Sequence, residues 1–487
     1  MSITSFRTLF YHVLLLAVVA LAAAGCAINP VTGEQELMLV SERQEIQLGN
    51  ELYPNALWSG EGGGGEFRDP ALKSYLSSLV VNIHRVSHRP NLPVDFAVQN
   101  TSVPNAWAIP GHVVMTRGLL AALDNEAEFV YVMGHEMGHV SARHSARQMT
   151  YGMLGQFLLA GAAVAMAGSE YSDAALTLGS AGAGLILLKF SRNDELEADR
   201  LGVEYMTRLG YDPRAALSAH RNLEKVSDQY ARSIGQSRQE SSFFSELLSS
   251  QPRASIRVEE IQNIINQTPR AAIAGDGTAR QRFQGAVANI RRVNAVYVNY
   301  YDKAVRSLEK NNTGEALSFV RQAIAQDPGQ APFYALYGSI LVKQNNLPEA
   351  ERYFSKALSI DGNYQPALRG MGAIRYAGNR YSESVQYLQR SLKLFPQDPA
   401  SNYFMGMNYY RTRSYRYAIG YLKPFSEAAP RHPRIHAILG QCYEAVGDYQ
   451  SAYGQYTMQL KVAPNNDAGG VARSRSRAIE MQFAPKK

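Results

Sequence analysis

The sequence contains few cysteines and little charge. Only two of its 487 residues are cysteine, Cys26 and Cys442, so no disulfide framework can be inferred. Charged residues make up 19% of the chain and apolar residues 46%, a balance that excludes an intrinsically disordered protein. A globular chain of this length exceeds one ordinary hydrophobic core, so we expect two or three domains.

The chain also lacks an even distribution of charge. Its net charge is +7, and the excess is confined to residues 301–487, which contain 24 Lys and Arg against 14 Asp and Glu. This positive part favours acidic partners or an anionic membrane surface. No nucleic-acid recognition motif accompanies it, so nucleic acid is not an expected partner.

An H-E-x-x-H motif, formed by His135, Glu136 and His139, lies within a stretch of helical periodicity. Histidines four positions apart are about 40° apart around a helix, so both can hold one metal ion. Glu136 lies beside them, where a general base is wanted. A buried helix with two hydrogen-bonded histidines is the alternative. His144 falls about 140° from His139, so we do not expect it on the metal-binding face.

A second stretch supplies a candidate third ligand. A zinc site with two histidines needs another protein ligand and an open position, and a carboxylate on a separate helix is a common donor. Glu195 lies well beyond His139 in the chain, and Asp199 follows it by one helical turn, where it can orient a ligand imidazole. The alternative is that both carboxylates belong to an ordinary solvated acidic face.

Together with two further stretches, these residues resemble a known family. The stretches are His135-Glu136-x-x-His139, Ser191-Arg192-x-x-Glu195-x-x-Ala198-Asp199, Asn29-Pro30-Val31-Thr32-Gly33 and Asn105-Ala106-Trp107-Ala108-Ile109-Pro110-Gly111. They look like those of the integral-membrane and periplasmic zinc metallopeptidases of the HtpX, CAAX-prenyl-protease and BepA type. The resemblance covers residues 29–265 and implies a mainly α fold with a small β-sheet, a gluzincin-type metallopeptidase domain.

The resemblance also implies a part in the chemistry for each matching residue. One Zn²⁺ per chain is bound by His135, His139 and Glu195. Glu136 takes a proton from the attacking water as general base, and Asp199 supports a ligand from behind.

Further from the metal, the resemblance implies contacts with the substrate. Asn105 and Ala106 belong to an edge strand that pairs with the backbone of an extended peptide. Trp107 belongs either to the core or to a substrate pocket. Arg257 matches the family arginine that faces the developing oxyanion, with a surface salt bridge as the alternative. Gln251 stands where relatives commonly have histidine, so control by an extra histidine ligand is not expected.

The first residues have the features of a secretory signal, with a basic start, an apolar run and small residues before Cys26. Ala23-Ala24-Gly25-Cys26 resembles a bacterial lipobox, although alanine stands at 23 where leucine is more usual. We therefore expect cleavage before Cys26 and lipidation of its sulfur, which would tether the chain to a membrane. A plain cleaved signal is the alternative.

Two uncharged runs, 148–169 and 174–188, are each close to the length that spans a bilayer. Both are rich in glycine and alanine, and only a short segment joins them. We expect a helical hairpin packed beside the active site, with membrane insertion as the alternative.

A repeated pattern begins near residue 297, with a period of about 34 residues. Gly338, Gly372, Gly406 and Gly440 follow this period. Small residues at helix crossings, together with prolines at turns, are the tetratricopeptide signature. Five helix pairs would then form an all-α solenoid whose concave face binds peptides or a protein partner, with a mere spacer as the alternative.

The expected organisation is a signal peptide (1–25), a tether (26–65), a zinc metallopeptidase domain (66–265), a linker (266–296), tetratricopeptide repeats (297–470) and a tail (471–487). We expect a zinc metalloendopeptidase in the periplasm, tethered to the outer membrane, that cleaves unfolded or misassembled proteins. Its repeats would bind substrate or the outer-membrane protein assembly machinery. The alternatives are a chaperone or docking protein with a latent protease site, and a membrane-embedded peptidase acting on lipid-modified or membrane peptides.

Overall fold

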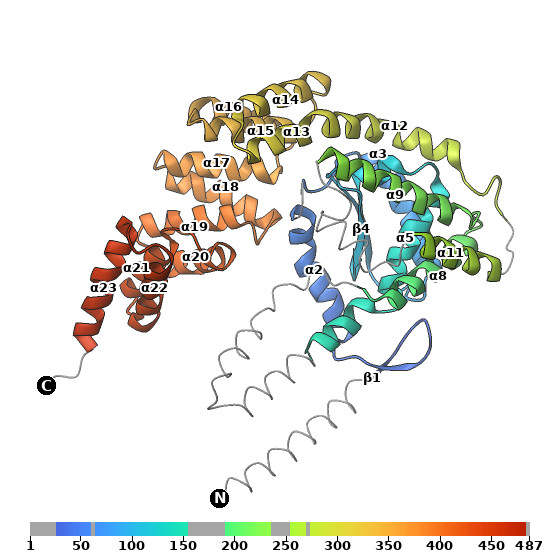
Figure 1. Ribbon diagram of the computed structural model, residues 1–487, viewed down its shortest axis with the longest axis horizontal. Helices are drawn as coiled ribbons and strands as arrows, with labels where there is room; N and C mark the ends of the chain where they lie inside the picture. Colours follow the sequence, from blue (N-terminus) through green and yellow to red (C-terminus); the bar gives the residue numbers. More distant parts are fainter. Residues whose placement is uncertain (1–25, 60–63, 154–189, 235–253, 269–272, 484–487) are drawn as a thin grey trace, which may run out of the picture. The chain divides into compact units, whose positions relative to one another are not determined.

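The computed structural model describes residues 26–59, 64–153, 190–234, 254–268 and 273–483 (Figure 1). The predicted signal peptide, most of the predicted hairpin and Gln251 lie outside these ranges. The chain divides into two compact units, Met1–Ala295 and Val296–Lys487. Within the described ranges, no helix combines the length and the apolar character needed to cross a membrane.

A three-stranded sheet organises the first unit. Its order is β3 (Val94–Gln99), β5 (Gly111–Thr116) and β4 (Ala106–Ile109), with β3 parallel and β4 antiparallel to β5. Gly111 joins β4 to β5 with a φ of +95°, a conformation that glycine adopts without steric cost. Because β4 lies at one end of the strand order, it is an edge strand in the described sheet.

Helices cover both faces of this sheet. On one face Leu57 of α2 (Glu42–Trp58) packs with Val114, and on the other Met137 of α5 (Glu126–Ser141) lies near Val113. Figure 1 shows α2 and α5 on opposite sides of β4. The remaining elements of the unit are the hairpin β1 (Cys26–Ile28) and β2 (Gln35–Leu37), and the helices α2 (Glu42–Trp58), α3 (Pro70–Val86), α4 (Arg117–Ala122), α5 (Glu126–Ser141), α8 (Arg192–Arg208), α9 (Ala215–Ser233), α11 (Ala254–Gln267) and α12 (Arg280–Val296), which ends one residue into the second unit.

Helices α5 and α8 touch each other through small residues. A Cβ atom added to Gly134 would lie 3.2 Å from the Cα atom of Gly202, and one added to Gly138 would lie 3.1 Å from the Cα atom of Ala198. At such distances the two backbones are in contact with no side chain between them. Polar side chains beside this crossing can therefore reach from one helix to the other.

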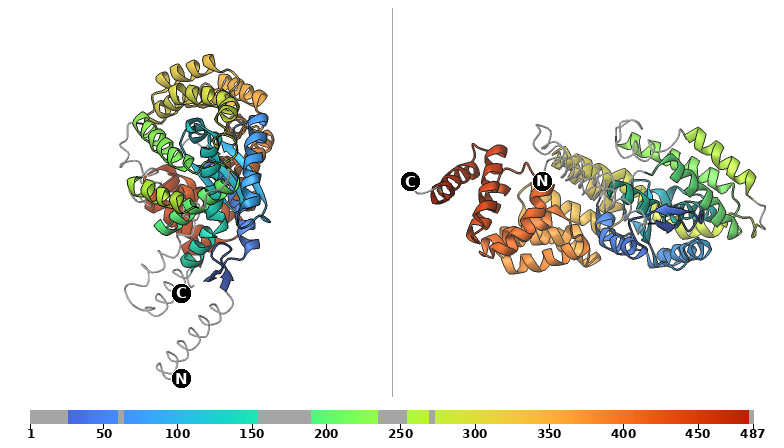
Figure 2. Two further views of the ribbon diagram at one scale, coloured as in Figure 1. Left: turned by 90° about the vertical axis from the view of Figure 1, so that its right-hand side faces the viewer. Right: turned by 90° about the horizontal axis from the view of Figure 1, so that it is seen from below.

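The second unit consists of helix pairs that repeat along the chain and stack on one another (Figures 1 and 2). After the π-helical turn η2 (Tyr297–Tyr301) they are α13 (Asp302–Glu309) with α14 (Thr313–Gln326), α15 (Ala331–Lys343) with α16 (Leu347–Ile360), α17 (Gln365–Ala377) with α18 (Tyr381–Leu394), α19 (Pro399–Arg411) with α20 (Tyr415–Ala428), and α21 (Ile435–Ala445) with α22 (Tyr449–Val462), followed by α23 (Asp467–Phe483). The mainly helical fold with small sheets, followed by an all-helical repeat region, confirms the predicted fold class.

Two features recur with the period of this unit. Each periodic glycine packs against a large side chain on the second helix of its pair; a Cβ atom on Gly372, for example, would lie 2.6 Å from the Cγ atom of Leu388. The other pairs are Gly338 with Phe354, Gly406 with Leu422 and Gly440 with Tyr456. The turn inside each helix pair contains one residue with positive φ, and these residues are Asn311, Asn345, Asn379, Arg413 and Gly447.

The described part of the second unit contains one free cysteine. Cys442 lies on α21 and is completely buried in a hydrophobic cluster with Leu439 and Ile435. Burial raises the pKa of its thiol to about 12, so the group is an apolar packing element in the folded chain.

Candidate metal centre

Three predicted ligand side chains converge between α5 and α8. His135 and His139 both lie on α5, and their Nε2 atoms are 3.2 Å apart. One carboxylate oxygen of Glu195 on α8 lies 3.7 Å from Nε2 of His135, and the other lies 3.8 Å from Nε2 of His139. All three donors lie within 4.8 Å of one another.

The spacing of these atoms fits a zinc ion. Donors bound about 2.0–2.2 Å from a tetrahedral ion lie roughly 3.3–3.6 Å from each other, close to the observed separations. Two imidazole nitrogens and a carboxylate are also a donor set that zinc accepts in catalytic sites, where one position stays open. His135, His139 and Glu195 thus fit the group that the motif predicts.

The first turn of α8 positions Glu195. The Ser191 hydroxyl accepts a hydrogen bond from the amide of Asp194 at 3.2 Å, and the Asp194 carboxylate accepts one from the amide of Ser191 at 2.8 Å. This reciprocal capping box fixes the start of the helix. Glu195 follows directly and is 7% exposed, so its carboxylate is held beside the two histidines of α5.

Asp199 supports His135 from behind. Its Oδ1 atom lies 2.8 Å from Nδ1 of His135 and also accepts a hydrogen bond from the Tyr131 hydroxyl at 2.8 Å. When Nδ1 of His135 donates this bond, the lone pair on its Nε2 atom is directed toward the space between the three candidate donors. Burial by itself lowers the pKa of His135, but the bond to Asp199 and its negative charge outweigh burial and raise it.

Arg257 lies inside this cluster. Its guanidinium donates to both carboxylate oxygens of Asp199 at 2.7 Å, and its Nη1 atom lies 3.3 Å from Glu195. Burial raises the pKa of Asp199, yet the Arg257 charge, the hydrogen bond from His135 and the nearby imidazole of His220 hold it well below its usual range. The side chain is 5% exposed, which excludes the surface salt bridge. In this structure Arg257 contacts the carboxylates of both Asp199 and Glu195.

His144 contacts the candidate ligand His139, a contact that the sequence did not indicate. Helix α5 ends at Ser141, Arg143 takes a φ of +56°, and the chain is helical again over residues 144–153. This sharp turn brings Nδ1 of His144 within 2.8 Å of Nδ1 of His139. His144 is not one of the three grouped donors, but its imidazole contacts that of His139 because α5 ends at Ser141.

Glu136 lies next to the ligands on α5 and is partly buried. Burial raises the pKa of its carboxyl to about 7; the charge of His135 lowers it and that of Glu195 raises it. A carboxyl group with a pKa near neutrality can accept and release a proton at the working pH. This environment suits the part that the motif predicts for Glu136.

The predicted substrate residues lie at and beside β4. The carbonyl of Asn105 accepts a hydrogen bond from the Thr116 amide at 2.8 Å, so the backbone of Asn105 faces β5. Bonded residues alternate along an antiparallel pair, and the backbone groups of Ala106 and Ala108 therefore point away from β5. Trp107 donates to Gln99 at 3.1 Å and packs with the cluster under α2, which is the core alternative.

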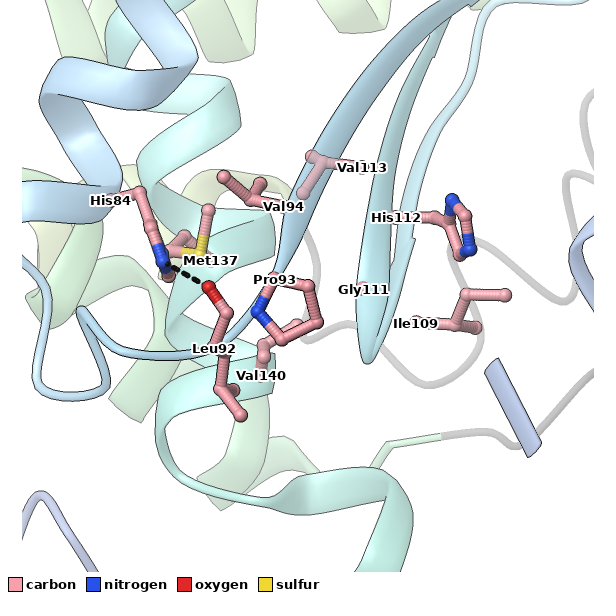
Figure 3. A pocket seen from close by; sticks show the side chains of 10 residues that line it. All are labelled: His84, Leu92, Pro93, Val94, Ile109, Gly111, His112, Val113, Met137 and Val140. Atoms are coloured by element: carbon pink, nitrogen blue, oxygen red, sulfur yellow. Dashed lines mark hydrogen bonds between the residues drawn. The ribbon is translucent and has the colours of Figure 1, made fainter. Parts of the chain in front are cut away.

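A small apolar pocket lies behind the active helix (Figure 3). Met137 and Val140 of α5 line it together with Val94 and Val113 of the sheet. None of the three candidate ligands contributes to its lining, so we assign the pocket to packing between α5 and the sheet. Cys26, the predicted lipidation site, is the first residue of β1.

Comparison with known proteins adds family information. Residues 68–265 match the model of peptidase family M48, and residues 307–355 and 403–457 match tetratricopeptide repeat models. A beta-barrel assembly-enhancing protease of Escherichia coli (strain K12) is 29% identical over 333 residues, which cover 62% of this chain and 64% of the relative. The alignment thus spans less than two thirds of that protein.

Another relative and a solved structure match smaller parts of the chain. Mitochondrial metalloendopeptidase OMA1 of Arabidopsis thaliana is 32% identical over 149 residues, covering 29% of this chain and 28% of the relative. The solved structure described as "Functional Characterization of Pseudomonas Aeruginosa pilF" is 18% identical and covers 39% of this chain and 91% of that chain, with a TM-score of 0.34.

Proposed function

Residues 68–265 form a peptidase family M48 domain, tetratricopeptide repeats follow it, and from this premise we propose that the chain is a zinc metalloendopeptidase of the bacterial cell envelope. The observation that carries the proposal is the group of His135, His139 and Glu195, whose donor atoms lie within 4.8 Å of one another beside Glu136. The proposed substrates are unfolded or misassembled proteins.

In the proposed mechanism the chain's own residues hold the ion and move the proton. His135, His139 and Glu195 would hold a zinc ion, which when bound would polarise the scissile carbonyl and acidify a water molecule. Glu136 accepts a proton from the attacking water at a carboxylate oxygen and then gives it to the leaving amine. Asp199 and Arg257 keep His135 and Glu195 in place during both transfers.

The outer side of β4 is the proposed binding strand for substrate. The amide and carbonyl groups of Ala106 and Ala108, which point away from β5, would form a ladder with an extended peptide. Backbone pairing recognises no particular side chain, which suits an enzyme for unfolded chains. The side chain of Asn105 is proposed as a further contact at the start of this strand.

We place the protein in the periplasm, anchored to the outer membrane through a lipid on Cys26. The proposed partner of the repeats is the outer-membrane protein assembly machinery. Two observations support this choice: the name of the Escherichia coli relative refers to beta-barrel assembly, and the repeat region has a net positive charge that favours acidic partners.

The competing proposal is a docking protein whose protease site is mostly latent. The match to tetratricopeptide repeat models supports a docking role as well as it supports a protease with a docking domain. Glu136→Gln separates the two. The variant should bind zinc and the partner as the wild type does but should lose at least about 10³-fold in cleavage of an unfolded outer-membrane protein. If the wild type also fails to cleave while partner binding persists, the docking role is correct.

A further inference from the structure

The two histidine ligands are supported in different ways. Nδ1 of His135 faces a carboxylate, Asp199, at 2.8 Å. Nδ1 of His139 instead faces another imidazole, that of His144, at 2.8 Å. His144 is completely buried, and its second nitrogen lies 3.1 Å from a carboxylate oxygen of Glu197.

The protons in this chain of groups can be assigned from the ligand geometry. Nε2 of His139 points at Nε2 of His135, 3.2 Å away, so it presents a lone pair when a metal is bound. Nδ1 of His139 then carries the proton and donates it to Nδ1 of His144. His144 must therefore carry its own proton on Nε2, from which it donates to Glu197.

We propose that His144 is a positioning residue of the metal site, which acts through His139 by accepting the hydrogen bond from its Nδ1 atom. This inference rests on the proposed zinc site. A buried acceptor at this point fixes both the tautomer and the ring orientation of His139, and such supports change metal affinity by about 10–100-fold.

Residues distant in sequence hold His144 in position. Arg147, one turn further on, pairs with Asp194 and lies 3.4 Å from the carboxylate of Glu36 on β2. Asp194 lies 3.6 Å from Nε2 of His144, so a negative group flanks that nitrogen on each side. Through these contacts the N-terminal hairpin β1–β2 braces the metal site.

The test uses the full chain and two substitutions, each of which keeps the hydrogen bond made by one of the two ring nitrogens of His144. In His144→Asn the side-chain oxygen takes the place of Nδ1 and still accepts a hydrogen bond from His139. In His144→Gln the side-chain amide takes the place of Nε2 and still donates to Glu197. His144→Leu keeps neither contact. Zinc affinity is measured by competition with a chromogenic chelator, and the ligand field by the visible spectrum of the cobalt-substituted protein.

The expected order is specific to an acceptor role. His144→Asn should remain within about threefold of the wild type, whereas His144→Gln and His144→Leu should lose about 10–100-fold in zinc affinity and show an altered cobalt spectrum. Equal losses in the Asn and Gln variants, or wild-type affinity in the Leu variant, would overturn the inference.

Two further measurements keep the outcome decisive. If the His144 variants do not fold, Glu197→Met removes the carboxylate from a side chain that is 19% exposed. A weaker zinc affinity in this variant supports the inference and an unchanged affinity overturns it. A wild type that binds no zinc would refute the proposed function itself, and the inference with it.

Discussion

The two units use small residues at helix contacts in opposite ways. In the peptidase unit, Gly134 and Gly138 of α5 meet Gly202 and Ala198 of α8, so glycine faces glycine or alanine and backbone touches backbone. In the repeat unit every periodic glycine faces a large side chain such as Leu388. The first arrangement brings two helices close enough for side chains of both to bind one metal ion. In the second, the large side chain fills the space left by the glycine, and the helices are joined by packing alone.

Residues with positive φ show the same contrast. In the repeats this conformation occurs once in each helix pair and is occupied mostly by asparagine or glycine, which tolerate it. In the peptidase unit one of the residues with positive φ is Arg143, whose guanidinium is buried and donates to Glu45 at 2.7 Å and to the Val40 carbonyl at 2.7 Å. In the repeat turns the residue type follows the backbone conformation, whereas at Arg143 the buried contacts of the side chain accompany that conformation.

The largest effect is expected at the crossing of α5 and α8. Gly202→Val should force the helices apart, because even a Cβ atom there would lie 3.0 Å from the backbone nitrogen of His135. We expect loss of bound zinc and of peptidase activity, measured by metal content and peptide cleavage. Gly285→Val on α12 is the matched control, since a Cβ atom at Gly285 meets no atom within 4 Å. Full zinc content in Gly202→Val would show that close approach is not required.

Arg143→Gly should be the next most damaging change. Glycine relieves the backbone strain, but the substitution leaves Glu45 with Arg89 as its remaining buried partner. We expect a cost of about 2–4 kcal/mol in local stability, because a buried ion pair loses one member. Hydrogen exchange of amides at the end of α5 would measure it. A variant as stable as the wild type would mean that the backbone conformation, not the side chain, decides this position.

A smaller and separate effect is expected from Gly372→Ala in the repeats. The new methyl group would overlap Leu388, and overpacking of this kind costs about 1–3 kcal/mol. Zinc content should not change. Adding Leu388→Val should recover part of the loss in amide protection of α17 and α18, since the two positions share one space. Independent effects of the two substitutions would contradict the packing seen here.

Arg413→Gly should give the smallest effect and the opposite sign from Arg143→Gly. Arg413 has a φ of +60° and an exposed side chain, so glycine removes strain without removing a buried contact. We expect a gain of up to about 1 kcal/mol in the protection of α19 and α20. A loss of protection would assign the arginine side chain a role in the turn.

The sequence predicts best those features that depend on spacing along one helix or one repeat. The positions of His135 and His139 on one face of α5, and the helix pairs of the repeat unit, follow from local periodicity. The sequence does not indicate the contact between His144 and His139, because a left-handed arginine has no sequence signal and local periodicity implies a helix that continues through it. The burial of Arg257 against Asp199, which is distant in sequence, depends on tertiary packing that no local pattern records.

The buried thiol of Cys442 can be used to follow the opening of helix α21 in the repeat unit. A thiol with no exposed surface and a pKa of about 12 reacts with a labelling reagent only when α21 separates from its neighbours. At reagent concentrations where labelling is faster than reclosing, the rate of its modification equals the opening rate of this helix pair. The same rate, followed while a client protein is added, would report whether binding holds that pair closed, without any engineered probe.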